Sequence, residues 1–117
     1  MLLKGVPTVI AREGRAPLTV AAGNPGLATG GSGDVLSGLV GTGLAHKLAP
    51  EVAAALGAQT LGRGADLAAR RTAARTLRPM DVVAALADLW REWELSRLTP
   101  PLSRPPTLLE LARPQTV

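Results

Sequence analysis

The chain has 117 residues, a net charge of +4 and a pI of about 11.1, and this length suffices for one small domain. It has no cysteine and one histidine, which excludes a disulfide scaffold, a thiolate metal site and a His-rich zinc site. No apolar run approaches 18 residues and the N-terminus lacks a signal-peptide pattern, so we expect neither a membrane span nor a cleaved leader, in keeping with a cytoplasmic protein.

The basic excess raises the question of nucleic-acid binding, but its distribution argues against it. Most of the excess is arginine scattered along residues 60–117, without a block of cations interleaved with aromatic side chains. The two aromatic residues, Trp90 and Trp93, lie among acidic residues instead. We therefore expect no nucleic-acid partner.

Short runs of apolar and β-branched residues at 1–4, 8–11 and 18–22 predict three strands joined by turns. Three strands so close together are expected at the edge of a larger sheet. Lys4 ends the first of them. Its residue type alone favours a solvated lysine at the sheet edge over a cation beside a phosphate.

Residues 23–34 are the most unusual part of the chain, because eight of its 13 glycines lie between Gly23 and Gly43. A glycine-rich turn followed by a helix N-terminus directs backbone amides at one point, which predicts a cradle for phosphate. Asp34 follows directly, where a carboxylate would repel the bound anion. It either takes a proton from a substrate hydroxyl or helps to hold a metal ion, or it merely caps the helix, and residue type alone favours the cap.

Residues 33–47 have the spacing of a helix with one buried face. Three glycines in this helix, Gly38, Gly41 and Gly43, disfavour an isolated helix and predict close contact with the sheet. His46, at the helix end, is expected to complement the helix dipole. The buried face is formed by Val35, Leu36, Leu39, Val40 and Leu44.

Two further helices are predicted, one from Pro50 to Arg71 and one that begins at Pro79. The second has apolar residues at helical spacing, which we interpret as a packing stripe. Residues 99–117 contain five of the ten prolines and no usable period, so we expect a disordered or loosely docked tail. The stripe consists of Val82, Val83, Leu86, Leu89, Trp90 and Trp93.

Two stretches together resemble a known family. The first is Leu3-Lys4-Gly5-Val6-Pro7-Thr8-Val9-Ile10-Ala11, and the second is Gly23-Asn24-Pro25-Gly26-Leu27-Ala28-Thr29-Gly30-Gly31-Ser32-Gly33-Asp34-Val35-Leu36. They resemble the C-terminal part of the ADP/ATP-dependent NAD(P)H-hydrate dehydratases of the ribokinase-like superfamily, with Leu27 in place of a methionine. The resemblance fades after Arg71, and residues 61–66 shuffle the glycines and the aspartate of the family's His-Gly-x-Ala-Gly-Asp segment.

The resemblance implies an α/β fold, in which residues 1–98 are the C-terminal part of a ribokinase-like domain and residues 99–117 lie beyond it. It also implies an enzyme that phosphorylates the ring hydroxyl of hydrated NADH or NADPH and then eliminates phosphate. ADP or ATP would be the co-substrate, with Mg²⁺ accompanying it, and a homo-oligomer is possible.

The resemblance also implies roles for individual residues. Asp34 would activate the hydroxyl and contact the hydrated cofactor, and no residue is assigned as a metal ligand. Thr29, Gly30, Gly31 and Ser32 would form the phosphate loop. The residues expected at the nucleotide are Lys4, Gly5, Val6, Pro7, Thr8 and Gly33. For Lys4, the resemblance thus favours a cation beside the phosphate over a solvated lysine at the sheet edge.

Two alternatives remain open at this point. One is a small-molecule kinase of the same superfamily, in which Asp34 would be the same base but the phosphorylated product would be stable. The other is an inactive fragment that retains the nucleotide loop without the strands that complete the substrate pocket. The length of the chain favours the fragment, whereas the extension around Asn24-Pro25-Gly26 favours the dehydratase over the kinase.

Overall fold

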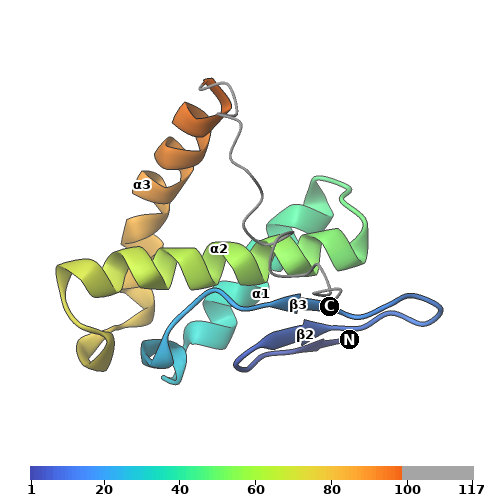
Figure 1. Cartoon of the computed structure of the whole chain (residues 1–117), viewed down its shortest axis with the longest axis horizontal. Coiled ribbons are helices and arrows are strands. Elements are labelled where there is room, and N and C mark those ends of the chain that lie inside the picture. Colours follow the sequence, from blue (N-terminus) through green and yellow to red (C-terminus); the bar gives the residue numbers. More distant parts are fainter. Residues whose placement is uncertain (99–117) are drawn as a thin grey trace, which may run out of the picture.

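The computed structural model describes residues 1–98, and the tail predicted at 99–117 lies outside the described residues. Three short strands are followed by three helices, so the expected α/β class is confirmed (Figure 1). The strands are β1 (Leu2–Leu3), β2 (Thr8–Ile10) and β3 (Leu18–Val20). The helices are α1 (Ser32–Ala45), α2 (Pro50–Arg71) and α3 (Pro79–Leu98), with short 3-10 turns η1 (Pro25–Leu27) and η2 (Ala74–Thr76).

The three strands form one antiparallel sheet in the order β1-β2-β3. Leu3 pairs with Val9, which pairs with Thr19 on the other side. The Met1 ammonium donates to the Ala11 carbonyl at 2.9 Å and thereby extends the β1–β2 pairing. All three predicted strands are confirmed, although each is shorter than its apolar run because the turns take up the flanking residues.

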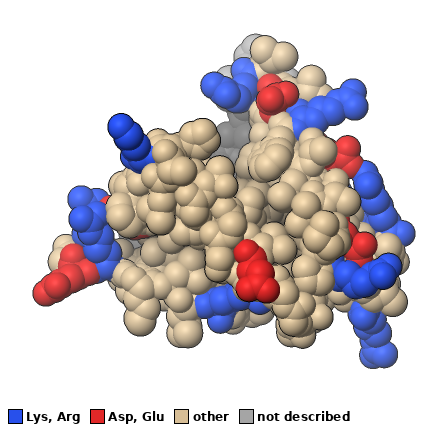
Figure 2. All heavy atoms as spheres, turned by 180° about the vertical axis from the view of Figure 1, so that it is seen from behind, with Lys and Arg blue, Asp and Glu red and all other residues tan. Residues whose placement is uncertain are grey.

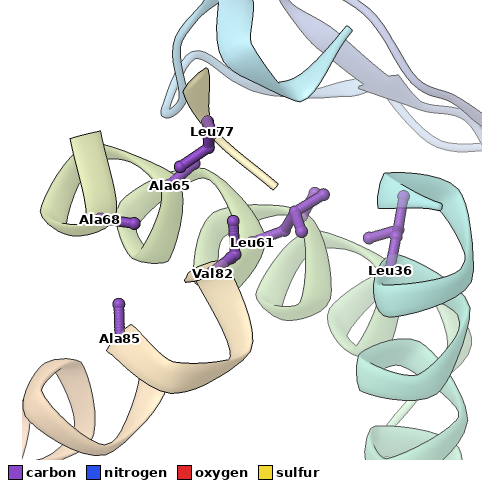
Figure 3. Packing of buried hydrophobic residues seen from close by; sticks show 8 residues of the cluster. Leu36, Leu61, Ala65, Ala68, Leu77, Val82 and Ala85 are labelled. Carbon is purple, nitrogen blue, oxygen red and sulfur yellow. The ribbon is translucent and has the colours of Figure 1, made fainter. Parts of the chain in front are cut away.

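α2 is the central element of the fold, since it contacts the sheet as well as both other helices (Figure 1). Its buried face consists almost entirely of Ala and Gly, which lets neighbouring backbones approach closely. Figure 3 shows larger side chains from α1, α3 and the segment before α3 converging on this face. The cluster comprises Leu36, Ala58, Leu61, Ala65, Ala68, Leu77, Val82 and Ala85.

The glycines of α1 contradict one expectation from the sequence. Gly43 packs on Ala53 of α2, where an added Cβ would come within 3.0 Å of the Ala53 Cβ, so the tight contact is made with a helix and not with the sheet. Gly38 and Gly41 face open space. The predicted buried face is also narrower than expected, because Leu36 is buried whereas Leu44 is 47% exposed.

The packing stripe predicted on α3 is confirmed in part. Val82, Leu86 and Leu89 are buried at helical spacing against the rest of the protein. Val83 and Trp90 lie on the adjoining face and are 38% and 48% exposed. His46 is exposed at the C-terminal end of α1, the place predicted for it.

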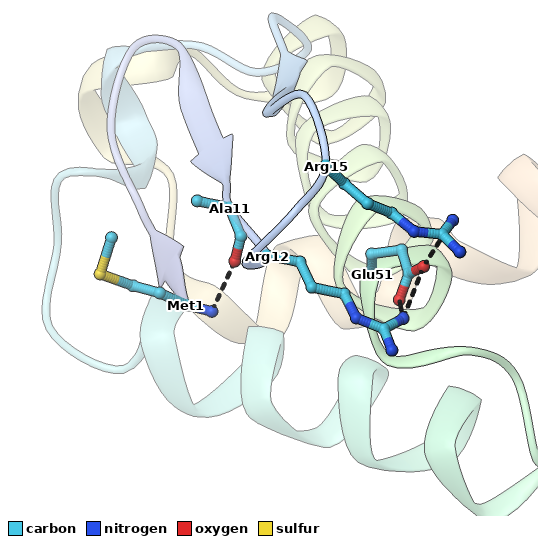
Figure 4. A network of polar contacts seen from close by, with 5 residues as sticks. All are labelled: Met1, Ala11, Arg12, Arg15 and Glu51. Carbon is cyan, nitrogen blue, oxygen red and sulfur yellow. Dashed lines mark hydrogen bonds and ion pairs between the residues drawn. The ribbon is translucent and has the colours of Figure 1, made fainter.

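A polar cluster joins the start of α2 to the turn between β2 and β3 (Figure 4). Arg12 donates to both carboxylate oxygens of Glu51 at 2.9 and 2.7 Å, and Arg15 lies 3.3 Å from the same carboxylate. The backbone amide of Glu51, helped by Arg12 and Arg15, lowers the pKa of this carboxyl despite an opposing effect of burial. Elsewhere, on the face shown in Figure 2, basic and acidic side chains are interspersed.

Candidate functional site

The glycine-rich segment leads from β3 to α1 through two tight changes of direction. Gly23 has a φ of 117° and Gly31 a φ of 90°, a region that favours glycine. Between them, Asn24 caps the turn η1 by accepting a hydrogen bond from the Gly26 amide at 3.0 Å. Gly31 is the residue before the first turn of α1, so the predicted change from loop to helix is confirmed.

Lys4 is joined directly to this segment although it lies 28 residues from Ser32. Its ammonium donates to the Leu27 carbonyl at 2.9 Å and to the Ser32 hydroxyl at 2.7 Å. Ser32 is only 2% exposed, and its hydroxyl lies within 2.8 Å of the Leu27 carbonyl and 3.1 Å of the Thr29 carbonyl. An ammonium has three N–H donors, and because the described residues take up two of them, one donor of Lys4 is left for a ligand.

Backbone amides remain available along the segment. The amides of Asp34 and Val35 donate to the Gly31 carbonyl, and the Ser32 amide makes a long bond of 3.4 Å to the Thr29 carbonyl. Within residues 1–98, the amides of Gly30, Gly31 and Gly33 donate to no protein group. All three glycines are exposed, and the space on the Cβ side of Gly30 and Gly33 is open.

Asp34 lies in the first turn of α1, adjacent to these amides, and is exposed. No described side chain caps the start of α1, and the Asp34 carboxylate makes no hydrogen bond or ion pair with any described residue. Asp34 therefore does not cap α1 through a hydrogen bond, although the helix dipole still favours an acid at this position. The Asp34 carboxylate is thus exposed and unpartnered among the described residues.

A cavity of about 280 Å³ separates the turn between β1 and β2 from the start of the glycine-rich segment. Four of the expected nucleotide residues, Lys4, Gly5, Val6 and Thr8, line this cavity. Pro7 and Gly33 do not line it, and neither does Asp34. The opposite wall is formed by Ala22, Gly23, Asn24, Pro25, Leu27 and Ala28, and the floor by Leu36, Ala58 and Leu61.

The cavity has an apolar floor with polar groups at its rim, the composition usual for small-molecule sites. Thr8 helps to shape the rim, because its hydroxyl donates to the Gly5 carbonyl at 3.3 Å and accepts from the Gly5 amide at 3.4 Å. Thr29 lies outside the cavity and lines a separate hollow of about 420 Å³ together with Arg75.

The sequence analysis missed Asp66. This half-buried residue of α2 accepts hydrogen bonds from the Gly23 amide at 3.3 Å and from the Asn24 side chain at 3.1 Å. The interpretation of residues 61–66 as shuffled is wrong for this residue, because Asp66 stands at the place of the aspartate in the His-Gly-x-Ala-Gly-Asp segment and only the alanine and glycine before it are exchanged. That position is the signal that could have found it.

The described part of the chain contains no group of three or more His, Asp and Glu side chains that could hold a metal ion. In the same part of the chain, no helix is both long enough and apolar enough to span a membrane.

Comparison with known proteins gives consistent matches. A family model described as NAD(P)H-hydrate dehydratase matches residues 1–87, which extends beyond the limit expected near Arg71. The chain is 43% identical over 94 residues to the bifunctional NAD(P)H-hydrate repair enzyme Nnr of Moorella thermoacetica, covering 80% of this chain and 18% of that protein.

Two further relatives agree with this match. The enzyme of the same name from Escherichia coli is 42% identical over 85 residues, or 73% of this chain and 16% of that protein. The ADP-dependent (S)-NAD(P)H-hydrate dehydratase of Neisseria meningitidis is 42% identical over 67 residues, or 57% of this chain and 23% of that protein. The chain thus spans less than a quarter of the length of each of these three relatives.

Proposed function

Because this chain belongs to the NAD(P)H-hydrate dehydratase family, we propose that it carries the nucleotide-binding and catalytic segment of an enzyme that dehydrates hydrated NADH or NADPH with ADP or ATP. Residues 1–98 would then be the C-terminal part of a ribokinase-like domain. One observation carries the proposal: within residues 1–98, the unpartnered Asp34 adjoins the free amides of Gly30, Gly31 and Gly33.

In this proposal the nucleotide occupies the cavity beside Lys4 and Thr8, and its terminal phosphate extends to the glycine-rich loop. Asp34 accepts the proton of the ring hydroxyl while the hydroxyl oxygen forms a bond to the terminal phosphorus and the shortened nucleotide leaves. The loop amides and the third donor of Lys4 stabilise charge on the transferred group.

The second stage is an elimination. The ring C–O bond breaks, inorganic phosphate leaves with the bonding electrons, and a proton is lost from the neighbouring ring carbon, so that the double bond re-forms. Mg²⁺ is expected with the nucleotide. Since the described residues provide no cluster of ligands for it, we assign no step to the metal.

Asp34→Asn tests the proposal, because asparagine keeps the size of the side chain but cannot accept the proton. We expect turnover of hydrated NADH, measured in a full-length protein that contains this segment, to fall by about 10²–10⁴-fold. Nucleotide binding should persist, so ADP or ATP should still raise the unfolding temperature of the 117-residue variant.

Asp88→Asn is the matched control, since Asp88 lies on α3 and pairs with Arg71 away from the loop. It should change neither turnover nor the effect of nucleotide.

Unchanged turnover in Asp34→Asn would remove Asp34 as the base. A wild-type chain whose unfolding is indifferent to ADP and ATP would contradict the nucleotide site. A stable phosphorylated product in place of NADH would favour the kinase alternative.

A further inference from the structure

Asp66 uses both of its carboxylate oxygens on the start of the glycine-rich segment. Oδ2 accepts from the Gly23 amide at 3.3 Å and Oδ1 accepts from the Asn24 side-chain amide at 3.1 Å. These contacts join α2 to a part of the chain more than 40 residues earlier, and all three residues are half-buried. Hydrogen bonds to a charged carboxylate are stronger than those between neutral groups.

Asn24 connects Asp66 to the next part of the loop. Its side-chain oxygen accepts from the Gly26 amide at 3.0 Å and so caps η1, the turn that precedes the anion-binding residues. Two residues thus connect a helix to a turn through three hydrogen bonds. Asp66 itself does not line the cavity, whereas Gly23 and Asn24 do.

The backbone around these contacts has little room to adjust. Gly62 lies one helical turn before Asp66 on the same face of α2, and a Cβ there would come within 2.4 Å of the Ala22 carbonyl oxygen. A Cβ at Gly26 would come equally close to the Ala74 carbonyl oxygen. The start of the segment is therefore held by direct backbone contact as well as by Asp66.

We propose that Asp66 is a positioning residue for the anion-binding loop, acting through Asn24 to fix the path of residues 23–27. That path sets one wall of the cavity and the direction from which residues 28–33 approach the start of α1. The proposal rests on the proposed function only in the identity of the ligand, because the positioning itself is measurable in the protein without any ligand.

Asp66→Asn is the first test, because it leaves one hydrogen bond that no arrangement can satisfy. If the oxygen of the new side-chain amide on α2 accepts from the Gly23 amide, its NH₂ group faces the NH₂ group of Asn24. If Asn24 turns over to avoid this conflict, its NH₂ group faces the Gly26 amide instead. A donor is left facing a donor in either case.

The double variant Asn24→Asp with Asp66→Asn exchanges the two side chains and restores every bond. The side-chain amide, now on α2, accepts from the Gly23 amide and donates to one oxygen of the carboxylate, now in the loop. The other oxygen of that carboxylate accepts from the Gly26 amide. Asn24→Asp alone places two carboxylates together, so of the three variants it should shift the loop amides most and bind ADP most weakly. Reciprocal rescue would show that the hydrogen bonds between these two side chains, and not either side chain alone, carry the effect.

Two properties of the 117-residue chain are measured. The first is the dissociation constant for ADP. The second is the set of NMR chemical shifts and hydrogen-exchange rates of the backbone amides of Gly23, Gly26, Gly30, Gly31 and Gly33. Asp66→Asn should shift these amides, speed exchange at Gly23 and Gly26, and weaken ADP binding about tenfold, the equivalent of one lost hydrogen bond. The double variant should return both measurements towards wild type, and Asp88→Asn should change neither.

Unchanged amides in Asp66→Asn, or a folded double variant that shows no recovery, would overturn the proposal. If Asp66→Asn does not fold, recovery of fold and amide shifts in the double variant still supports it, and failure of that recovery overturns it. A wild-type chain that does not bind ADP would contradict the proposed function alone, and the amide measurements would then decide the role of Asp66.

Discussion

Glu51 ties the start of α2 to the turn between β2 and β3, and its environment keeps it charged. Its backbone amide and the two arginines hold its pKa below the usual glutamate value of 4.5. The stability that this carboxylate contributes is therefore fully present above that value. It is lost as the pH falls through the lowered pKa of the folded state, because the unfolded chain binds the proton more readily.

Glu51→Gln should consequently flatten the loss of stability on acidification below about pH 4.5. Urea unfolding at a series of pH values measures this directly. Glu13→Gln is the control, because Glu13 is exposed in the same turn and makes no ion pair with the described residues. Equal slopes for the wild type and Glu51→Gln would show that the cluster does not contribute to folding.

The residue types of the candidate site were predictable to different degrees. Asp34 stands out in the sequence because a carboxylate directly follows a run of glycines that we propose bind phosphate. Asp66 does not stand out, because its partners Gly23 and Asn24 are more than 40 residues away. Such a contact exists only once α2 has packed against the loop. The roles of the predicted site residues remain proposals that the variants above test.

Among the elements, α2 was the most predictable. The predicted bounds of α2, Pro50 and Arg71, are those observed, because a proline at the first position and cations in the last turn are local signals. The partners of the α1 glycines were not predictable in the same way. Which element packs on Gly43 depends on the path of α2, which the sequence of α1 does not contain.

The glycines of the helices should respond to alanine in opposite ways. Gly62→Ala places a Cβ against the Ala22 carbonyl oxygen, so the backbone of one of the two segments must move. We therefore expect the free energy of unfolding to fall by about 1–3 kcal/mol. Gly41→Ala, the control, adds a methyl group in open space within α1 and should gain about 0.5–1 kcal/mol. Chemical unfolding measures both, and a change of the same sign in both would contradict the packing described for α2.

At the scale of the whole molecule, α3 completes the core around α2. Leu89 and Val82 are both fully buried, and both come from α3. Leu89→Ala should therefore lower the free energy of unfolding by about 2–5 kcal/mol. This is a large share of the total, because a domain is typically stable by about 5–15 kcal/mol. Met80→Ala is the control, since Met80 is 69% exposed. Equal midpoints of chemical unfolding for the two variants would show that α3 is not part of the cooperative core.

The amino-acid sequence was sufficient for the three strands, both bounds of α2, the first residue of α3 and the change from a glycine-rich turn to a helix. Each depends on neighbouring residues, whether alternation, helical period, a proline start or a run of glycines. Only the tertiary structure decided that Lys4 reaches Ser32, that Asp66 holds Gly23 and Asn24, and that α2 rather than the sheet packs on Gly43. These contacts join segments distant in the chain, and their partners are fixed by how close-packed backbones fit together rather than by local preference.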